Sequence, residues 1–253
     1  MGYIVYGGRQ AENSGGQEGF RMRFRIGICL AAAAISLSPV AAWSQIGWNI
    51  DLDDDFAPPE GGGGLPSSDF GAAAGEQGRG YWNYLDTTGD PPTQLRGLDG
   101  VLTPVVVTGP TSGGGGGNNF RGNTGDFALL LNDGRLSPSG DTWTVSGLEP
   151  GKYKTYVYAV APDDRVNPTV VTVAGIERIV TGPMPGNRFE VGVTHAEIEF
   201  DLIGNSFDIR VDRGQFRNAW INGFQVMAVV PEPGTLAVVS FALLFLRSRK
   251  RRS

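Results

Sequence analysis

Short stretches in which apolar and polar residues alternate constrain the fold of this 253-residue chain more than any other feature. In the stretch 196–203, Ile198, Phe200 and Leu202 alternate with three acidic residues, and the stretch 207–212 repeats the pattern. A period of two residues is typical of a β-strand with one buried face and one solvated face. From Tyr81 onward, Gly, Pro and Asp turns separate eight to ten such runs, and none has the period of an amphipathic helix. The sequence therefore predicts an all-β fold, a jelly-roll-type antiparallel β-sandwich.

Composition divides the chain into four segments. We expect an N-terminal extension with a signal peptide over 1–44, a Gly/Asp/Pro-rich segment with one strand over 45–80, the β-sandwich domain over 81–229, and a sorting signal over 230–253. Within the sandwich, Pro104 predicts an edge strand for the stretch 101–108, because proline cannot donate to a ladder. The stretch 127–131 is read as a strand or one helical turn, and 189–193 as a strand.

The N-terminal region has the features of a secretory signal peptide. Met22, Arg23 and Arg25 lie in a short basic region, and the apolar run 26–37 follows it. We expect cleavage before Gln45, with cleavage after Ala42 as the alternative, and either Met1 or Met22 as the start. The only cysteine lies in the apolar run, so the mature protein would have no disulfide and no thiolate metal site.

The C-terminal region combines a stiff motif, an apolar run and a basic end. Pro231, Glu232 and Pro233 form the motif, in which each proline fixes φ and lacks a donor. The apolar run 234–246 would span about 20 Å as a helix, less than the roughly 30 Å of a bilayer core. We expect a short transmembrane segment that is recognised and cut, with a tail anchor or an amphipathic stub as the alternatives. Its membrane stop comprises the basic residues Arg247, Arg249, Lys250, Arg251 and Arg252.

This order of motif, apolar run and basic end resembles the PEP-CTERM sorting signal of exopolysaccharide-producing bacteria. The resemblance implies that an exosortase-type membrane protease recognises Pro231, Glu232 and Pro233. It also implies that the precursor resides in the inner membrane, and that the mature protein reaches the cell surface or the extracellular matrix.

The charge of the exported part limits its partners. Between Gln45 and Pro233 the chain has 12 of its 21 Lys and Arg residues but 24 of its 26 Asp and Glu residues, a balance of −12. Such a surface repels nucleic acid, so we expect no nucleic-acid partner. The run Asp53, Asp54 and Asp55 lacks the later glycine and glutamate of a calcium loop, so we read it as a solvated linker. We predict no cofactor or metal, with a structural calcium ion as the alternative.

No group of residues in the sequence predicts catalysis. His195 is the only histidine, and the chain has no Gly-x-Ser-x-Gly nucleophile elbow for it to serve. Glu197, Glu199 and Asp201 occupy alternate positions, which is the expected solvent face of a half-buried strand. We therefore expect a protein that is not an enzyme. The alternative is a carbohydrate-active enzyme, a glycan hydrolase or lyase on a jelly-roll scaffold, that uses two of the carboxylates.

A second resemblance covers the stretch 71–229. The stretches 81–83, 143–153, 156–159 and 221–226 look like jelly-roll domains of the galactose-binding and carbohydrate-binding-module type. The resemblance implies a polysaccharide partner or a structural role. Tyr156, Tyr158 and Trp82 are the candidate ligand-binding residues, with core packing as the alternative, whereas Trp143 and Trp220 are expected in the core.

Overall fold

The computed structural model describes residues 45–53, 64–86, 92–111, 114–115, 122–161, 167–215 and 218–230. The predicted signal peptide, the Pro231–Pro233 motif, the apolar run 234–246 and the basic residues after it lie outside these ranges. Within the described ranges, no helix has the length and apolar character needed to cross a membrane.

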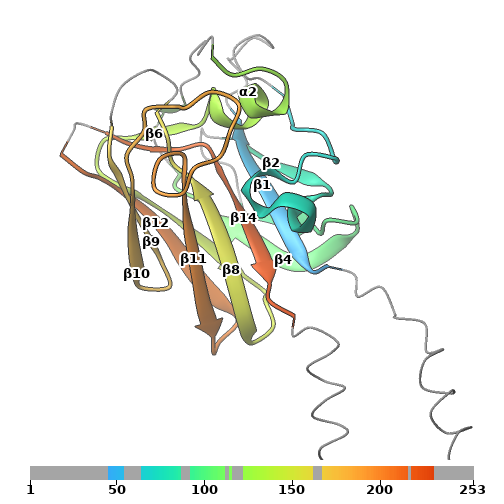
Figure 1. Cartoon of the computed structure of the whole chain (residues 1–253). Helices are drawn as coiled ribbons and strands as arrows, with labels where there is room; N and C mark the ends of the chain where they lie inside the picture. Colours follow the sequence, from blue (N-terminus) through green and yellow to red (C-terminus); the bar gives the residue numbers. More distant parts are fainter. Residues whose placement is uncertain are drawn as a thin grey trace, which may run out of the picture. The chain divides into compact units, whose positions relative to one another are not determined.

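Two large β-sheets form the body of the sandwich (Figure 1). The five-stranded sheet has the order β11-β8-β14-β1-β2, and the six-stranded sheet has the order β10-β9-β12-β7-β4-β3. The strands of the first sheet, in that order, are His195–Leu202, Gly151–Tyr158, Gly223–Ala228, Gly47–Asp53 and Trp82–Asp86. Those of the second are Ile176–Val180, Thr169–Val173, Ser206–Arg213, Asp141–Ser146, Leu102–Thr108 and Thr93–Arg96.

Smaller elements lie beside the two large sheets. A three-stranded sheet has the order β13-β6-β5, with bounds Ala219–Ile221, Arg135–Ser137 and Gly114–Gly115. A 3-10 helix, η2, spans Ala72–Gly78, and a short α-helix, α2, spans Asp126–Leu131. The prediction of an all-β sandwich is therefore confirmed.

The alternation read from the sequence places one face of each strand in a shared core. In β11, Ile198, Phe200 and Leu202 point inward, and in β12 the inward residues are Phe207, Ile209 and Val211. Both sets belong to one cluster that also contains Trp143 of β7, so residues of both large sheets share this core. Burial of such side chains stabilises by about 1.5–3 kcal/mol each.

Four local expectations need correction or refinement. The strand expected within 45–80 is β1, which pairs with β14 and β2 inside the five-stranded sheet, so this segment contributes to the sandwich. The β1–β2 pair is parallel, which departs from the antiparallel prediction. The stretch 127–131 was expected to be a strand or one helical turn, and it is helical. The stretch 189–193 was expected to be a strand, but it is a loop with a single β-bridge at Val191.

The edge position expected from Pro104 is also wrong, since β4 lies between β7 and β3. Only Val106 to Thr108 of β4 pair with β7. On the other side, the register with β3 shifts between Gln94 and Arg96, at the level of Pro104. The proline is tolerated inside the sheet because no regular ladder bond is required at its position.

Candidate functional site

The three predicted ligand-binding aromatics lie on the outer face of the five-stranded sheet. Strand register places Glu197, Tyr156, Gln225, Asn49 and Trp82 in one row across β11, β8, β14, β1 and β2. Tyr158 lies two residues along β8 from Tyr156 and therefore points to the same face. The alternation in the sequence thus placed Tyr156 and Tyr158 correctly on one face of β8.

These aromatics are nevertheless buried. Trp82, Tyr156 and Tyr158 are 2%, 5% and 0% exposed, and all three belong to a second apolar cluster on this face. That cluster includes Ala74 of η2 and Leu131 of α2, which shows what covers the sheet. Burial removes the three rings from contact with a sugar, so their role as the exposed ligand surface is corrected to packing.

Three phenylalanines form the outer layer over this buried face, and we call Phe70, Phe127 and Phe189 the phenylalanine cluster. The centroids of the Phe127 and Phe189 rings are 4.8 Å apart in a stacked arrangement, and the Phe70 ring lies 5.1 Å from Phe127 with its edge toward it. Phe70 also lies 6.3 Å from Trp82, and Phe189 lies 5.4 Å from Tyr158. All three phenylalanines are only partly buried, unlike the rings beneath them.

Polar side chains at the rim hold the segments that carry the phenylalanine cluster. The Asp126 carboxylate accepts hydrogen bonds from the Ser67 amide and hydroxyl, both at 2.8 Å. The Asn187 side chain accepts from the Thr124 amide at 2.8 Å and donates to the Thr124 hydroxyl at 2.7 Å. These contacts are exposed, so an apolar surface is bordered by hydroxyl, amide and carboxylate groups that can also bind solvent or ligand.

A buried network of polar side chains fixes η2 on the sheet. Asn49 Nδ2 donates to the Gly78 carbonyl at 2.7 Å, and Gln225 Nε2 donates to Asn49 Oδ1 at 2.8 Å. The Tyr158 hydroxyl donates to Gln225 Oε1 at 2.5 Å and accepts from the Ala73 amide at 2.8 Å. Burial raises the pKa of this hydroxyl well above its usual range, so it remains a donor. Two of these contacts join η2 to the sheet and the other two link the strands beneath it, so the network positions the segment that follows Phe70.

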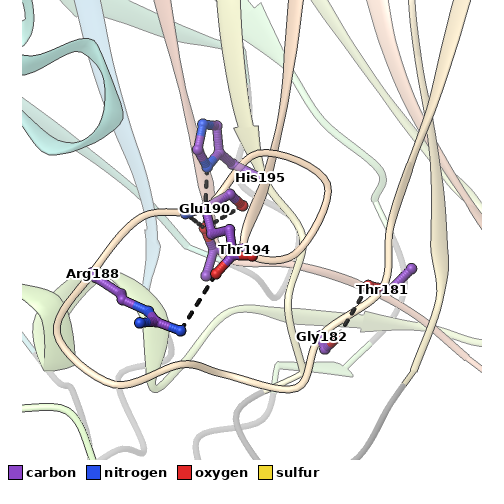
Figure 2. A network of polar contacts seen from close by, with 6 residues as sticks. All are labelled: Thr181, Gly182, Arg188, Glu190, Thr194 and His195. Atoms are coloured by element: carbon purple, nitrogen blue, oxygen red, sulfur yellow. Dashed lines mark hydrogen bonds and ion pairs between the residues drawn. The ribbon is translucent and has the colours of Figure 1, made fainter.

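Figure 2 shows the polar contacts of the loop that carries Phe189. Thr194 Oγ1 accepts from the Glu190 amide at 2.9 Å and lies 3.1 Å from His195 Nδ1. Arg188 forms an ion pair with the Glu190 carboxylate at 3.5 Å. Thr194 therefore ties the base of this loop to the first residue of β11.

His195 lies in a box of aromatic rings. Its ring centroid is 6.1 Å from Tyr156, 5.8 Å from Tyr158 and 6.0 Å from Phe189. Burial lowers the pKa of His195 to about 4, and the nearby Glu197 opposes this shift. The imidazole is therefore neutral near pH 7 and packs among these rings.

Acidification should weaken the fold through His195. In the unfolded chain its pKa is near 6.5, so the unfolded state takes up the proton first as the pH falls. The contribution to the free energy of unfolding is fully present above pH 6.5 and is lost between pH 6.5 and about 4, by roughly 3 kcal/mol. Urea unfolding at pH 7, 5.5 and 4 would measure this loss. The His195→Phe variant should lose about 3 kcal/mol less of its free energy of unfolding between pH 7 and pH 4 than the wild type. The same pH dependence in both proteins would contradict the lowered pKa of His195.

Two of the three carboxylates considered for catalysis, Glu197 and Glu199, are held in ion pairs, and we call Lys152, Lys154, Glu197 and Glu199 the charge ladder. Lys152 Nζ lies 2.9 Å from Glu199 Oε1, and Lys154 Nζ lies 2.5 Å from Glu197 Oε1. The hydrogen bond from Lys152 lowers the pKa of Glu199. A glycosidase acid needs the opposite shift, since it must stay protonated at its working pH.

The remaining sequence expectations have simple outcomes in the structure. Trp143 and Trp220 are buried, as expected for core residues. Asp54 and Asp55 of the acidic run lie outside the described residues. Among the residues that the structure describes, no group of three or more His, Cys, Asp or Glu side chains could hold a metal ion.

Sequence reasoning missed the phenylalanine cluster and the amide network. Phe70, Phe127 and Phe189 come from three separate loops or short helices, and no local period connects them. Gln225 and Asn49 are 176 residues apart and meet only through the β1–β14 register. The one local signal was Gln225, a polar residue in the otherwise apolar strand β14.

Comparisons with known proteins identify no family for the chain. No family model matches it, and no curated protein matches it. Among solved structures, it is similar to the CBM35 module from Cellvibrio japonicus Abf62, with 12% identity over 37% of this chain and 69% of that chain and a TM-score of 0.27. A family 35 carbohydrate-binding module from Clostridium thermocellum has 14% identity over 37% and 74%, with a TM-score of 0.26.

A longer match is to the protein YxiM from Bacillus subtilis, with 10% identity and a TM-score of 0.37. It covers 74% of this chain but only 41% of that protein. All three TM-scores lie below 0.5, so the sandwich described above rests on the strand pairing of this chain itself.

Proposed function

We propose that this chain is an exported, non-catalytic protein of the cell surface or extracellular matrix that binds polysaccharide. The observation that carries the proposal is the phenylalanine cluster on the outer face of the five-stranded sheet. Its three rings remain partly exposed above a fully packed aromatic layer, and hydrogen-bonding groups border them. An apolar platform with a few polar groups at its rim suits a sugar ring, which has apolar C–H faces and hydroxyl edges.

The route of export in this proposal comes from the two ends of the sequence. A signal peptide would direct the chain across the inner membrane, and an exosortase-type protease would act at Pro231, Glu232 and Pro233. The balance of −12 between Gln45 and Pro233 supports a role outside the cell, where an acidic surface favours solubility.

The charge ladder supports a binding role over the carbohydrate-active enzyme. Glu197 and Glu199 each have a lysine partner, and the pKa of Glu199 is lowered rather than raised. Neither carboxylate has the environment of a general acid. Incubation with a panel of polysaccharides should therefore release no reducing sugar or unsaturated product, and turnover of any member would overturn the non-catalytic role.

Binding should depend on Phe127. Phe127→Ala removes one ring of the stacked pair, and we expect at least a ten-fold weaker affinity in gel-affinity electrophoresis or calorimetry with the best polysaccharide of the panel. The matched control is Ile179→Ala, since Ile179 is an exposed apolar residue of β10 outside both apolar clusters. Thermal melts of both variants would show that each is folded. Equal affinity of the wild type and Phe127→Ala would overturn the proposed surface.

A further inference from the structure

Exposed apolar side chains concentrate at one end of the sandwich. Nine large apolar side chains are exposed in the part of the chain that the structure describes. Six of them lie around the points where β1 begins and β14 ends, and we call this set the apolar end. Its members are Ile46, Tyr81, Val101, Leu102, Ile203 and Val229.

Backbone hydrogen bonds join three members of the apolar end through β1, β8 and β14. The Ala228 amide donates to the Ile46 carbonyl at 2.9 Å, which brings Val229 next to Ile46. The Val229 amide donates to Lys152 at 2.8 Å. Leu202, the last residue of β11, pairs with Gly151, which directly precedes Lys152 in β8. Ile203 directly follows Leu202, so it lies close to Lys152. These contacts place Ile46, Val229 and Ile203 at the same end of the five-stranded sheet.

The other three members lie at or beside the turn between β3 and β4: Val101 in the turn, Leu102 at the start of β4, and Tyr81 directly before β2. The Leu98 amide donates to the Gly47 carbonyl at 3.1 Å, so this turn lies against the first residue of β1. The Tyr81 amide donates to Leu98 at 2.9 Å, and the Gly97 amide donates to Val101 at 2.9 Å. Leu102 follows Val101 as the first residue of β4.

We propose that the apolar end rests on the surface of a lipid bilayer while the apolar run 234–246 is held in that bilayer. This inference rests on the membrane-bound precursor of the proposed function. Figure 1 shows β1 beginning and β14 ending at the same end of the sandwich. Only three residues, 231–233, separate Val230 from the apolar run, and three residues reach at most about 10 Å. The tether alone therefore brings this end of the sandwich, and no other, to the membrane.

The chemistry of the apolar end suits the interfacial region of a bilayer. Tyr81 is an amphipathic side chain, and the Arg96 guanidinium lies 5.8 Å from its ring centroid. Tyrosine and arginine are favoured at the boundary between lipid chains and water, where an apolar body and a polar tip are both satisfied. The aliphatic members of the set carry no charge themselves, so their side chains can enter the headgroup region. The short segment 231–233 holds the apolar end close to a bilayer, but it does not bring a second copy of the chain to this surface. A bilayer therefore accounts for the apolar end better than a dimer contact.

The test compares two labelled positions at opposite ends of β11. Ile203 follows the last residue of this eight-residue strand and is 91% exposed, whereas Val191 bridges to its first residue and is 62% exposed. The two positions are about 25 Å apart along the strand direction. Ile203→Cys and Val191→Cys, each in the full chain with Cys29→Ser, would carry an environment-sensitive fluorophore. Both proteins would be reconstituted in phosphatidylcholine vesicles that contain a nitroxide at the headgroup level.

We expect at least five-fold stronger quenching of the label at position 203 than of the label at position 191. Equal or absent quenching in protein that floats with the vesicles would overturn this inference but leave polysaccharide binding untouched. Energy transfer between copies labelled at position 203, without lipid quenching, would assign the surface to a second copy and would also overturn it. Failure of the chain to float with vesicles would overturn the membrane-bound precursor and this inference together.

Discussion

Gln225→Ala is expected to lower the free energy of unfolding by about 4 kcal/mol. The Gln225 side chain is fully buried, and its amide donates to Asn49 Oδ1 at 2.8 Å and to the Gly71 carbonyl at 3.1 Å. Its carbonyl accepts from the Tyr158 hydroxyl at 2.5 Å and from the Ala74 amide at 3.2 Å. Truncation leaves several buried polar groups without these partners, and each such group costs about 1–3 kcal/mol.

Urea unfolding of the purified protein would measure this loss, with Gln94→Ala as the matched control. Gln94 donates to the Thr103 carbonyl in an exposed hydrogen bond, where water can replace the lost partner. Its truncation should change the free energy of unfolding by no more than about 0.5 kcal/mol. Faster amide exchange of η2 should accompany Gln225→Ala, because the network fixes this helix on the sheet. Similar losses for the two glutamines would contradict the role of the network.

Gly147→Ala is expected to destabilise the fold by about 2–5 kcal/mol. Gly147 lies in the turn between β7 and β8 with φ +81°, a conformation that costs an L-residue roughly 1–2 kcal/mol. A Cβ at this position would also lie 2.3 Å from the Pro104 carbonyl oxygen, so backbone would have to move. Overpacking of this kind costs about 1–3 kcal/mol more.

Gly175→Ala separates these two contributions. Gly175 has φ +82° in the turn between β9 and β10, and a Cβ there would meet no atom within 4 Å. This variant should therefore lose only the conformational part, about 1 kcal/mol. The midpoints of thermal or urea unfolding of the two variants would show the difference. An equal loss at both positions would mean that the contact with Pro104 carries no cost.

The strands of the sandwich could be predicted from the sequence wherever one face meets the core and the other meets water. β11 and β12 fulfil this condition, and their alternation appears directly in the residues 196–212. The same reasoning was incomplete for β8, because Tyr156 and Tyr158 on its outer face alternate correctly but meet a second layer of protein. Alternation identifies two faces, and it does not identify what covers each of them.

The candidate site could be predicted only as far as one face of one sheet. Trp82, Tyr156 and Tyr158 share that face, but their burial depends on η2, α2 and the loop of Phe189, which are distant in sequence. The polar residues that hold η2 in place are recognised only after the register of β1 and β14 is known. Such long-range pairing leaves no local pattern, so a single sequence cannot supply it.

The position of β14 has a consequence for how the chain acquires its structure. The strand formed by residues 223–228 lies between β8 and β1, although it is the last strand in the sequence. During synthesis from the N-terminus, the five-stranded sheet therefore remains in two separate pieces, β1 with β2 and β8 with β11. Until residue 228 has left the ribosome, β14 cannot pair with the edge strands β8 and β1. The five-stranded sheet therefore cannot be completed until the C-terminal part of the domain has been made.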